Sequence, residues 1–215
     1  MAEPALLYDY WRSSASYRLR IALNIKAIAY RAVPVDLLEG DQQSQAHLER
    51  NPQGFVPVLE IDGRRMTQSL AIIEYLEATR PEPALLPSDP IGQQRVRMLS
   101  QMVAMDIHPI CNLVVFREVM ARAGGGEATK RAWMHLFIGR GLAALEAQLQ
   151  DGWTGRFCHG DQVSLADLCL VPQVYNAKRS QIDMAAFPTI QRINEACLES
   201  EAFELARPEN CRQSG

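Results

Sequence analysis

The sequence has no long hydrophobic run: no apolar stretch approaches the roughly 18 residues that a membrane-spanning helix needs. The beginning, Met1–Pro4, shows no basic region followed by an apolar core, so we expect no secretory signal. An excess of one charge is absent too, since the formal net charge is −3 and the pI is about 5.8. Neither nucleic acid nor a membrane is therefore an expected partner. Together these absences predict a cytoplasmic protein.

Paired cysteines are also missing. The five cysteines form no CxxC motif, and no two cysteines or histidines stand at the spacing of zinc ligands. An odd number of thiols without an export signal favours reduced cysteines over disulfides. We therefore expect no metal site and no disulfide framework.

The remaining composition is that of an ordinary globular protein. Of the 215 residues, 47% are hydrophobic and 22% are charged. This length fits one large domain or two small ones. The question is then how the secondary structure is distributed along the chain.

The N-terminal part mixes strands and helices. Residues 5–8 and 29–35 are typical of strands, and residues 18–26 between them have helical spacing, which makes a βαβ unit with parallel strands. A polar stretch with a possible short helix at 44–50 follows. Asp62-Gly63 then predicts a hairpin between strands 58–61 and 64–67.

The next segments are helical. A helix is expected over 68–80, with Ser69 as its N-cap and Pro81 and Pro83 ending it. Four prolines between Pro81 and Gly92 indicate an interdomain linker. Later helices are expected at 93–123 with a kink at Pro109, at 130–150 with Leu136 facing inward, at 165–179, and at 188–198 before a polar tail. Ser164 and Asp167 match a capping box, so a structural role is expected for Asp167.

One stretch, Trp11–Leu23, suggests chemistry. Its serines lie where a strand gives way to a helix, and the unpaired N–H groups of a helix N-terminus stabilise an anion. Hydroxyl groups there also donate hydrogen bonds to a thiolate or carboxylate. The alternative is a capping cluster without chemistry. Gln68 and Ser69 form a second such helix start.

Pro57 begins a strand-like run, which fits a residue without an N–H, since proline belongs at the start of a strand or on an edge strand. A trans Val56–Pro57 bond is the ordinary expectation, since only about one X–Pro bond in twenty is cis. A cis bond would leave the backbone of Val56 free to pair with an extended peptide.

Several segments together carry a family resemblance: Arg12–Leu23, Asn51-Pro52 with Val56-Pro57, Gln68–Glu77, Asp106–Pro109, and Leu165–Val174 with Asn176-Ala177. The chain resembles the zeta class of glutathione transferases, whose members include maleylacetoacetate isomerases. The resemblance implies an α/β thioredoxin-like glutathione-binding domain at residues 1–83, a linker at 84–92 and an all-α substrate domain at 93–215. It also implies a homodimer.

The resemblance assigns roles by position. It makes Ser13 the hydroxyl that faces the glutathione sulfur, with Ser14 beside it, and it implies a cis Pro57. The residues that it places around glutathione are Ser13, Ser14, Ala15, Ser16, Gln42, Val56, Pro57, Gln68, Ser69, His108, Asn112 and Leu113. The family's usual cysteine falls at Ala15, a departure that removes a thiol from the site.

The implied reaction is a glutathione-dependent cis–trans isomerisation of a dicarbonyl diacid such as maleylacetoacetate. The thiolate adds to the double bond, the bond rotates, and glutathione is expelled. Arg12 and Arg179 are the candidates for holding the two carboxylates, because a guanidinium binds a carboxylate through two hydrogen bonds. Maleylpyruvate is an alternative substrate. Two further functions compete with the isomerase: a transferase or dehalogenase acting on α-halo acids, and a non-catalytic glutathione-binding protein.

Overall fold

The computed structural model describes residues 4–212, which form two compact units. One unit contains the described residues up to Leu85 and those from Glu199 onward, and the second is Leu86–Leu198. The predicted boundary near residue 84 lies close to this division. The structure differs from the predicted domain 93–215 at its end, because the chain returns to the first unit after Leu198.

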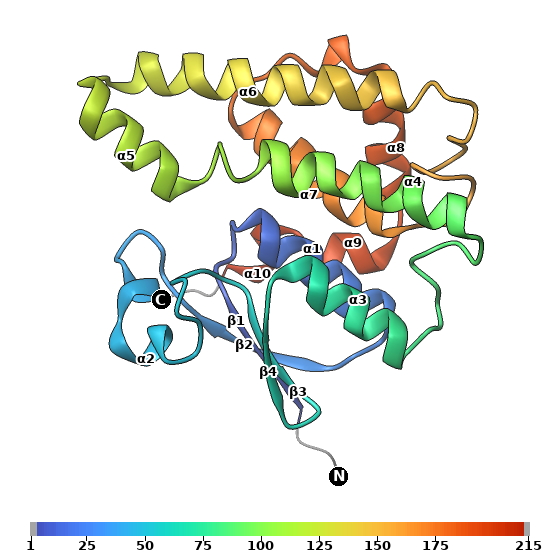
Figure 1. Cartoon of the computed structure of the whole chain (residues 1–215), viewed down its shortest axis with the longest axis horizontal. Helices are drawn as coiled ribbons and strands as arrows, with labels where there is room; N and C mark the ends of the chain where they lie inside the picture. Colours follow the sequence, from blue (N-terminus) through green and yellow to red (C-terminus); the bar gives the residue numbers. More distant parts are fainter. Residues whose placement is uncertain (1–3, 213–215) are drawn as a thin grey trace. The chain divides into compact units, whose positions relative to one another are not determined.

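The first unit is built on a four-stranded mixed sheet in the order β2-β1-β3-β4 (Figure 1). The strands are β1 (Ala5–Asp9), β2 (Tyr30–Pro34), β3 (Val58–Ile61) and β4 (Arg64–Thr67). β1 runs parallel to β2 and antiparallel to β3, so Leu7 pairs with both Ala32 and Leu59. The predicted hairpin is confirmed, and both Asp62 and Gly63 have positive φ angles.

Two helices, α1 (Ser14–Ile25) and α3 (Ser69–Thr79), pack against each other beside this sheet. α1 begins four residues before the predicted start at Arg18, because Ser13 already caps it. A short 3₁₀ helix, η1 (Asp41–Gln43), and α2 (Gln45–Leu48) lie between β2 and β3.

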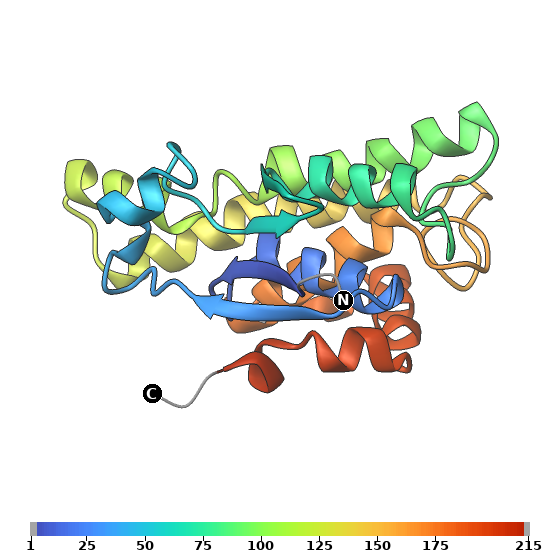
Figure 2. The same ribbon diagram turned by 90° about the horizontal axis from the view of Figure 1, so that it is seen from below.

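The C-terminal segment is helical and not the predicted polar tail. It forms α9 (Glu201–Leu205) and α10 (Pro208–Cys211), and α9 packs against α1. Figure 2 shows these last helices, in red, at the bottom of the view. Arg20 Nε donates to the Ala206 carbonyl at 3.1 Å and Asn24 Nδ2 to the Ala202 carbonyl at 2.9 Å. These long-range bonds explain why the end of the chain belongs to the first unit.

The second unit is helical in the part that the structure describes. Its elements are α4 (Pro90–Gln101), the π-helical segment η2 (Met102–Ile107), α5 (Leu113–Ala123), α6 (Glu127–Gln148), α7 (Leu165–Arg179), the 3₁₀ helix η3 (Met184–Ala186) and α8 (Pro188–Leu198). α7 is its core, since α4 and α8 both pack against it and Leu165–Val174 are all buried. No helix of the described residues is long and apolar enough to cross a membrane.

The predicted single helix over 93–123 is wrong. α4 starts three residues earlier, at Pro90, with Asp89 as its N-cap. After η2, a turn at His108–Cys111 breaks the helical path, and Asn112 caps a new helix by accepting the Val115 N–H at 2.8 Å. Proline without an N–H at position 109 and a strong capping side chain three residues later favour this break over a kink.

The inward-facing prediction for Leu136 is also wrong, since this side chain is 42% exposed. The buried face of α6 is set by Met134, Ile138, Leu142 and Leu145. These residues repeat every three or four positions, and Leu136 falls on the opposite side.

The predicted capping box at the start of α7 is confirmed. Asp167, which is fully buried, accepts hydrogen bonds from the N–H and Oγ of Ser164 and from the Cys158 N–H, each at 2.8 Å. The carboxylate therefore joins the preceding loop to the central helix of the unit.

Asp167→Ala is expected to destabilise the protein by about 3 kcal/mol or more. It breaks the capping box and leaves the buried N–H groups of Cys158 and Ser164 unpaired, at about 1–3 kcal/mol each. Urea unfolding measures the loss, and Asp161→Ala, an exposed aspartate of the same loop, is the comparison. Equal stability of the two variants would contradict the structural role.

Candidate functional site

The N-terminus of α1 carries hydrogen-bond donors that have no acceptor. Ser13 Oγ accepts the Ser16 N–H at 3.2 Å, which leaves the hydroxyl proton of Ser13 free to donate elsewhere. Among the described residues, the N–H groups of Ser14 and Ala15 find no acceptor. Two N–H groups and one O–H group, at the positive end of a 12-residue helix, are therefore available to an anion.

Ser16 lies one turn further into the helix. Its side chain is fully buried, and its Oγ has no hydrogen-bond partner in the described part of the chain. Ala15 beside it offers a backbone N–H but no side-chain donor. The serine cluster thus caps the helix and also leaves donors unused, which a purely structural role does not require.

The Val56–Pro57 bond is cis, as the resemblance implies. No described residue bonds to the backbone of Val56, although the loop before it is firmly held. His47 Nε2 donates to the Phe55 carbonyl at 3.0 Å, and Asn51 Nδ2 donates to the same oxygen at 2.9 Å. The loop thus presents an unpaired backbone edge at Val56.

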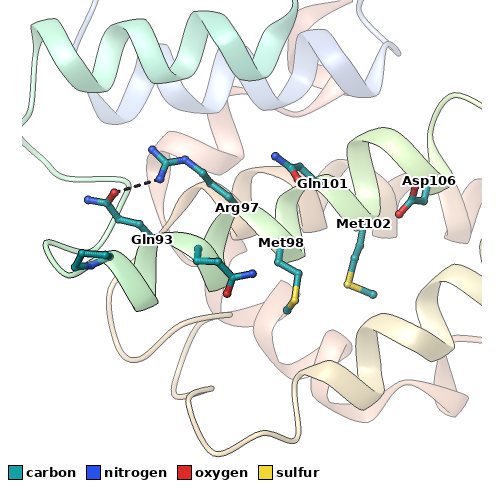
Figure 3. Close-up of a pocket in the computed structure, with 8 residues that line it drawn as sticks. Gln93, Arg97, Met98, Gln101, Met102 and Asp106 are labelled. Carbon is teal, nitrogen blue, oxygen red and sulfur yellow. Dashed lines mark hydrogen bonds between the residues drawn. The ribbon is translucent and has the colours of Figure 1, made fainter.

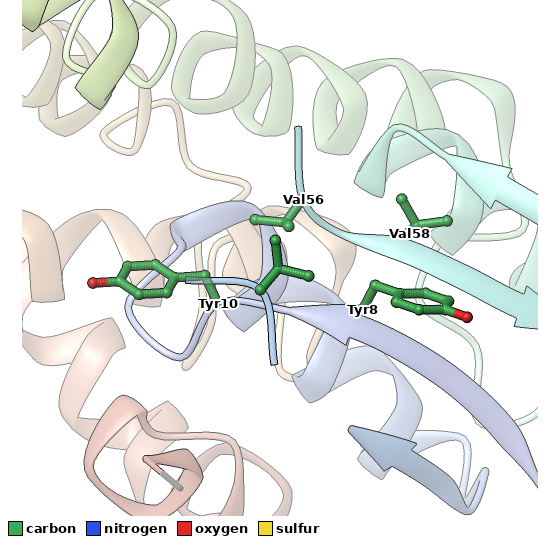
Figure 4. Close-up of a cluster of buried hydrophobic side chains, with 5 residues drawn as sticks. Tyr8, Tyr10, Val56 and Val58 are labelled. Atoms are coloured by element: carbon green, nitrogen blue, oxygen red, sulfur yellow. The ribbon is translucent and has the colours of Figure 1, made fainter. Parts of the chain in front are cut away.

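A hydrophobic cluster fixes this loop against the end of β1. Tyr8 and Tyr10 come from β1 and the residue after it, Val56 comes from the loop before β3, and Val58 is the first residue of β3 (Figure 4). Tyr8 pairs directly with Val58 in the sheet. Because Ser13 follows β1 within four residues, the cluster brings the α1 N-terminus and the Val56 loop to the same end of the sheet.

The start of α3 is a second helix end with unused donors, and it has no side-chain cap. Gln68, and not the predicted Ser69, is the N-cap residue; it has φ of 67° and makes no capping bond. The N–H groups of Ser69, Leu70 and Ala71 have no acceptor among the described residues. This helix of 11 residues therefore also offers donors to an anion.

Gln42 lies in η1, next to the Val56 loop. A side chain at Gly54 would collide with Gln43 and would crowd the Gln42 carbonyl, so glycine allows the loop and η1 to approach closely. Gln42 is 5% exposed, and its Oε1 has no partner in the described residues. A buried amide oxygen without a donor is unusual and marks a place for one.

The predicted arginines lie in different units. Arg12, in the first unit, donates from Nη2 to Tyr10 Oη at 2.8 Å and lies over the Trp11 ring, while its Nε is buried without a partner in the described chain. Arg179, the last residue of α7, is exposed and belongs to the second unit.

His108, Asn112 and Leu113 also belong to the second unit, in and after the turn that follows η2. Asn112 caps α5 and Leu113 is its first residue. The structure therefore brings the N-terminal members of the predicted set together within the first unit and places these three residues near one another in the second.

A hollow of about 660 Å³ on the second unit contains none of the predicted residues (Figure 3). It runs along α4 and η2, where Met98 and Met102 point into it and Arg97 Nη1 donates to Gln93 Oε1 at 3.1 Å. Its one arginine is engaged with a neutral amide, and the helix start at Pro90 is already capped by Asp89. We do not place the site there.

The protein's own thiols are poor nucleophiles. All five cysteines are free, and burial raises the pKa of Cys111 to about 11 and raises those of Cys158, Cys197 and Cys211. No group of three or more metal-ligating side chains occurs in the residues that the structure describes. An anion or sulfur nucleophile at the α1 N-terminus would thus come from a bound molecule.

Comparison with known proteins decides the family. Residues 7–84 match the model of the glutathione S-transferase N-terminal domain, and residues 128–213 match that of the C-terminal domain. The chain is 60% identical to a maleylacetoacetate isomerase of Rhizobium meliloti over 212 residues, which cover 99% of this chain and 100% of the relative. It also matches a holo structure of a zeta-class maleylpyruvate isomerase with a TM-score of 0.95 and 43% identity, covering 98% of this chain and 100% of that one. The chain is a zeta-class glutathione transferase.

A further solved relative of this transferase shows what such a protein holds. A maleylacetoacetate isomerase of Methylobacterium extorquens AM1, solved with bound malonate and GSH, has a TM-score of 0.94 and 42% identity, covering 98% of this chain and 99% of that one. The free donors at α1 and α3, the unpaired Val56 backbone and the open Gln42 amide are the features in this transferase that fit such a peptide.

One contact of this transferase was not predicted. Gln68 Nε2 donates to Gln53 Oε1 at 2.9 Å, and Gln53 N–H is held in turn by Asn51 Oδ1 at 3.1 Å. Gln53 therefore fixes which way the Gln68 amide points. Nothing in the sequence signals this pair, because the two glutamines are fifteen residues apart and neither belongs to a spacing motif.

Proposed function

We propose that this transferase is a glutathione-dependent maleylacetoacetate isomerase. The observation that carries the proposal is the α1 N-terminus, where a capping hydroxyl and two unpaired N–H groups can receive an anion. The similarity to maleylacetoacetate isomerases over nearly the whole chain supports the same reaction. When bound, glutathione supplies the thiolate that adds to the cis double bond, permits rotation and then leaves.

The chain's own residues have defined tasks in this proposal. The Ser13 hydroxyl donates a hydrogen bond to the sulfur, and the Ser14 and Ala15 N–H groups add the positive field of the helix end. An unperturbed cysteine thiol has a pKa of about 8.5, so donors that stabilise the anion increase the reactive fraction at neutral pH. Ala15 stands where the family resemblance places a cysteine. The site therefore lacks that thiol but keeps all of these hydrogen-bond donors.

The remaining residues hold the tripeptide and the substrate. The backbone of Val56 pairs with the cysteinyl portion, and Gln68 and Ser69 at the start of α3 hold the γ-glutamyl carboxylate. Gln42 and Ser16 bind further parts of the peptide. The family resemblance assigns His108, Asn112 and Leu113 to glutathione binding, and we assign Arg12 and Arg179 to the carboxylates of the diacid.

The proposal includes a cytoplasmic location and a homodimer. Five free thiols suit a reducing compartment. Along the helical stretch that borders the hollow of Figure 3, Ile91 and Met105 are 69% and 57% exposed, a surface that a second copy could cover. Light scattering on the purified protein tests the assembly, with a dimer of the 24.1 kDa chain expected.

The function is tested by supplying a small amount of glutathione with excess maleylacetoacetate. We expect loss of the cis isomer without net consumption of glutathione. Maleylpyruvate is assayed in parallel, since one solved relative is a maleylpyruvate isomerase. An α-halo acid is the third substrate. Halide release with consumption of glutathione, and no isomerisation, would favour a transferase or dehalogenase and contradict the proposal.

Alkylation gives an independent prediction. Iodoacetamide treatment at pH 7, followed by removal of the reagent and addition of fresh glutathione, is expected to leave kcat/KM unchanged. With a pKa of about 11, Cys111 is roughly 10,000-fold more thiol than thiolate at this pH. Ala15→Cys is the matched variant, because it restores a thiol beside the anion-binding donors and is expected to become sensitive. Inactivation of the unmodified sequence would show that one of its own cysteines takes part.

A further inference from the structure

A cavity of about 350 Å³ lies in the first unit, next to the α1 N-terminus. Its walls come from three separate places in the sequence: the end of β1 with the residues after it, the end of β2 with the residues after it, and the end of α10 with Arg212. Arg12 is in the wall, and Ser13, the residue next to it, is the α1 N-cap. The cavity contains none of the residues predicted to hold glutathione.

Two guanidinium groups meet at one indole in this cavity. The Cζ of Arg12 lies 4.7 Å from the centre of the Trp11 ring, and the Cζ of Arg212 lies 5.2 Å from a Trp11 ring centre. Both arginines also line the same cavity, so an anion that enters it meets two cationic side chains held by one indole. Stacking on an aromatic ring is a common way to hold a guanidinium in place while leaving its N–H groups free.

Both arginines keep donors for a ligand. Arg12 uses Nη2 for Tyr10 Oη, while its Nε is buried without a partner among the described residues. Arg212 contacts the Trp11 ring and makes no hydrogen bond or ion pair with any described residue. No carboxylate of the described residues forms an ion pair with either arginine.

The negative charges around the cavity do not cancel these cations. Asp9 is bound by Arg20 Nη1 at 2.7 and 3.0 Å and is thereby neutralised. Asp36 remains, and its Oδ1 already accepts the Leu38 N–H at 2.8 Å. The cavity thus carries a net positive charge, with aromatic and apolar walls from Tyr10, Trp11 and Val35.

We propose that Arg212, with Arg12, forms the subsite for one carboxylate of the dicarboxylate substrate. This inference rests on the proposed function for the identity of the ligand. It makes Arg212, in the C-terminal segment, a residue that determines substrate specificity, in addition to Arg179 and the residues that bind glutathione. Arg12 is the sequence neighbour of Ser13, whose hydroxyl is proposed to face the sulfur. The carboxylate subsite therefore lies beside the α1 N-terminus.

Kinetics provide the first test. Arg212→Gln is expected to raise KM for the diacid about 10-fold to 100-fold, since it removes a charge-assisted hydrogen bond, while the Kd of glutathione stays unchanged. Arg212→Lys should recover part of the loss. Asp36→Asn should shift KM in the opposite direction, because it removes the remaining negative charge and keeps the Oδ1 acceptor. The control is Arg207→Gln, a partly exposed arginine of the same segment that is paired with Glu204.

Binding of a substrate-like diacid without catalysis is the second test. In a Trp133→Phe/Trp153→Phe background Trp11 is the one remaining tryptophan of the sequence, and its fluorescence is titrated with succinate and, separately, with butyrate. We expect a saturable change with succinate that weakens at least 10-fold when Arg212→Gln is added. Thermal unfolding curves that match the parent exclude a folding defect in each variant.

The outcomes separate this inference from the proposed function. An unchanged KM and unchanged succinate titration in Arg212→Gln would overturn the inference, even if the protein isomerises maleylacetoacetate. An Arg212-dependent succinate response in a protein without isomerase activity would support the carboxylate site and refute the proposed function. A KM that rises equally in Arg207→Gln and Arg212→Gln would show a general effect of charge and would also overturn the inference.

Discussion

Replacing Ser13 by aspartate is expected to abolish isomerisation while leaving the fold intact. Aspartate is as good an N-cap as serine, so α1 should keep its start at Ser14. The new carboxylate, however, has no proton to donate at neutral pH and repels a thiolate. Loss of a single donor to a developing or bound anion typically lowers kcat about 100-fold to 1,000-fold, and repulsion adds to that loss.

Ser13→Ala separates the two roles of this residue. It removes the donor and the cap together, so activity should fall about 100-fold and the free energy of unfolding by about 1 kcal/mol. Steady-state kinetics and urea unfolding on both variants make the comparison. If Ser13→Asp retained activity, the serine would be a capping residue only, without a part in the chemistry.

The second large effect concerns stability. Asp9→Ala is expected to cost about 3–5 kcal/mol, because it leaves the buried guanidinium of Arg20 without its counter-charge. Arg20 also donates to the carbonyls of Trp11 and Ala206, so it connects β1, α1 and the C-terminal segment. The same change should loosen the two segments that carry Arg12 and Arg212, the residues of the proposed carboxylate subsite.

Two variants control this experiment. Glu60→Ala breaks the exposed pair with Arg65 and should cost no more than about 1 kcal/mol. Asp9→Leu combined with Arg20→Met removes both charges and should recover much of the stability, since an apolar pair often replaces a buried ion pair without loss. Urea unfolding measures all three. A loss for Asp9→Ala as small as that for Glu60→Ala would contradict the account.

Local patterns predicted much of the fold. The hairpin at Asp62-Gly63, strand 58–61, the capping box at Ser164 and helix 188–198 follow from turn chemistry, alternation and caps, which act over a few residues. The resemblance added the cis Val56–Pro57 bond, which composition alone does not favour.

The errors involve contacts between distant parts of the chain. Residues 199–212 look polar in the sequence but form α9 and α10. Arg20 and Asn24 hold this segment through the carbonyls of Ala206 and Ala202, which are 186 and 178 residues further along the chain. The break after η2 depends on Asn112 capping a new helix, and the burial of α6 depends on which neighbours surround it. Sequence periodicity carries none of this information.

In the candidate site, too, features set by neighbouring residues were predictable and contacts between distant residues were not. Serines at a strand-to-helix junction were recognisable from the sequence, because a helix N-terminus has known needs. The contact of Gln53 with Gln68, and that of Arg212 with Trp11, join residues that no spacing motif relates. The roles of His108 and Arg179, which belong to the second unit, were inferred from the family resemblance and are still proposals.

Titration of the glutathione thiol on the protein tests the central claim most directly. The thiolate is followed by its ultraviolet difference absorption as pH rises, with Ser13→Asp as the matched control. The account predicts that bound glutathione ionises well below the free cysteine value of about 8.5, and that Ser13→Asp abolishes this shift. A bound thiol that ionises like the free one, or a protein that binds no glutathione, would contradict it.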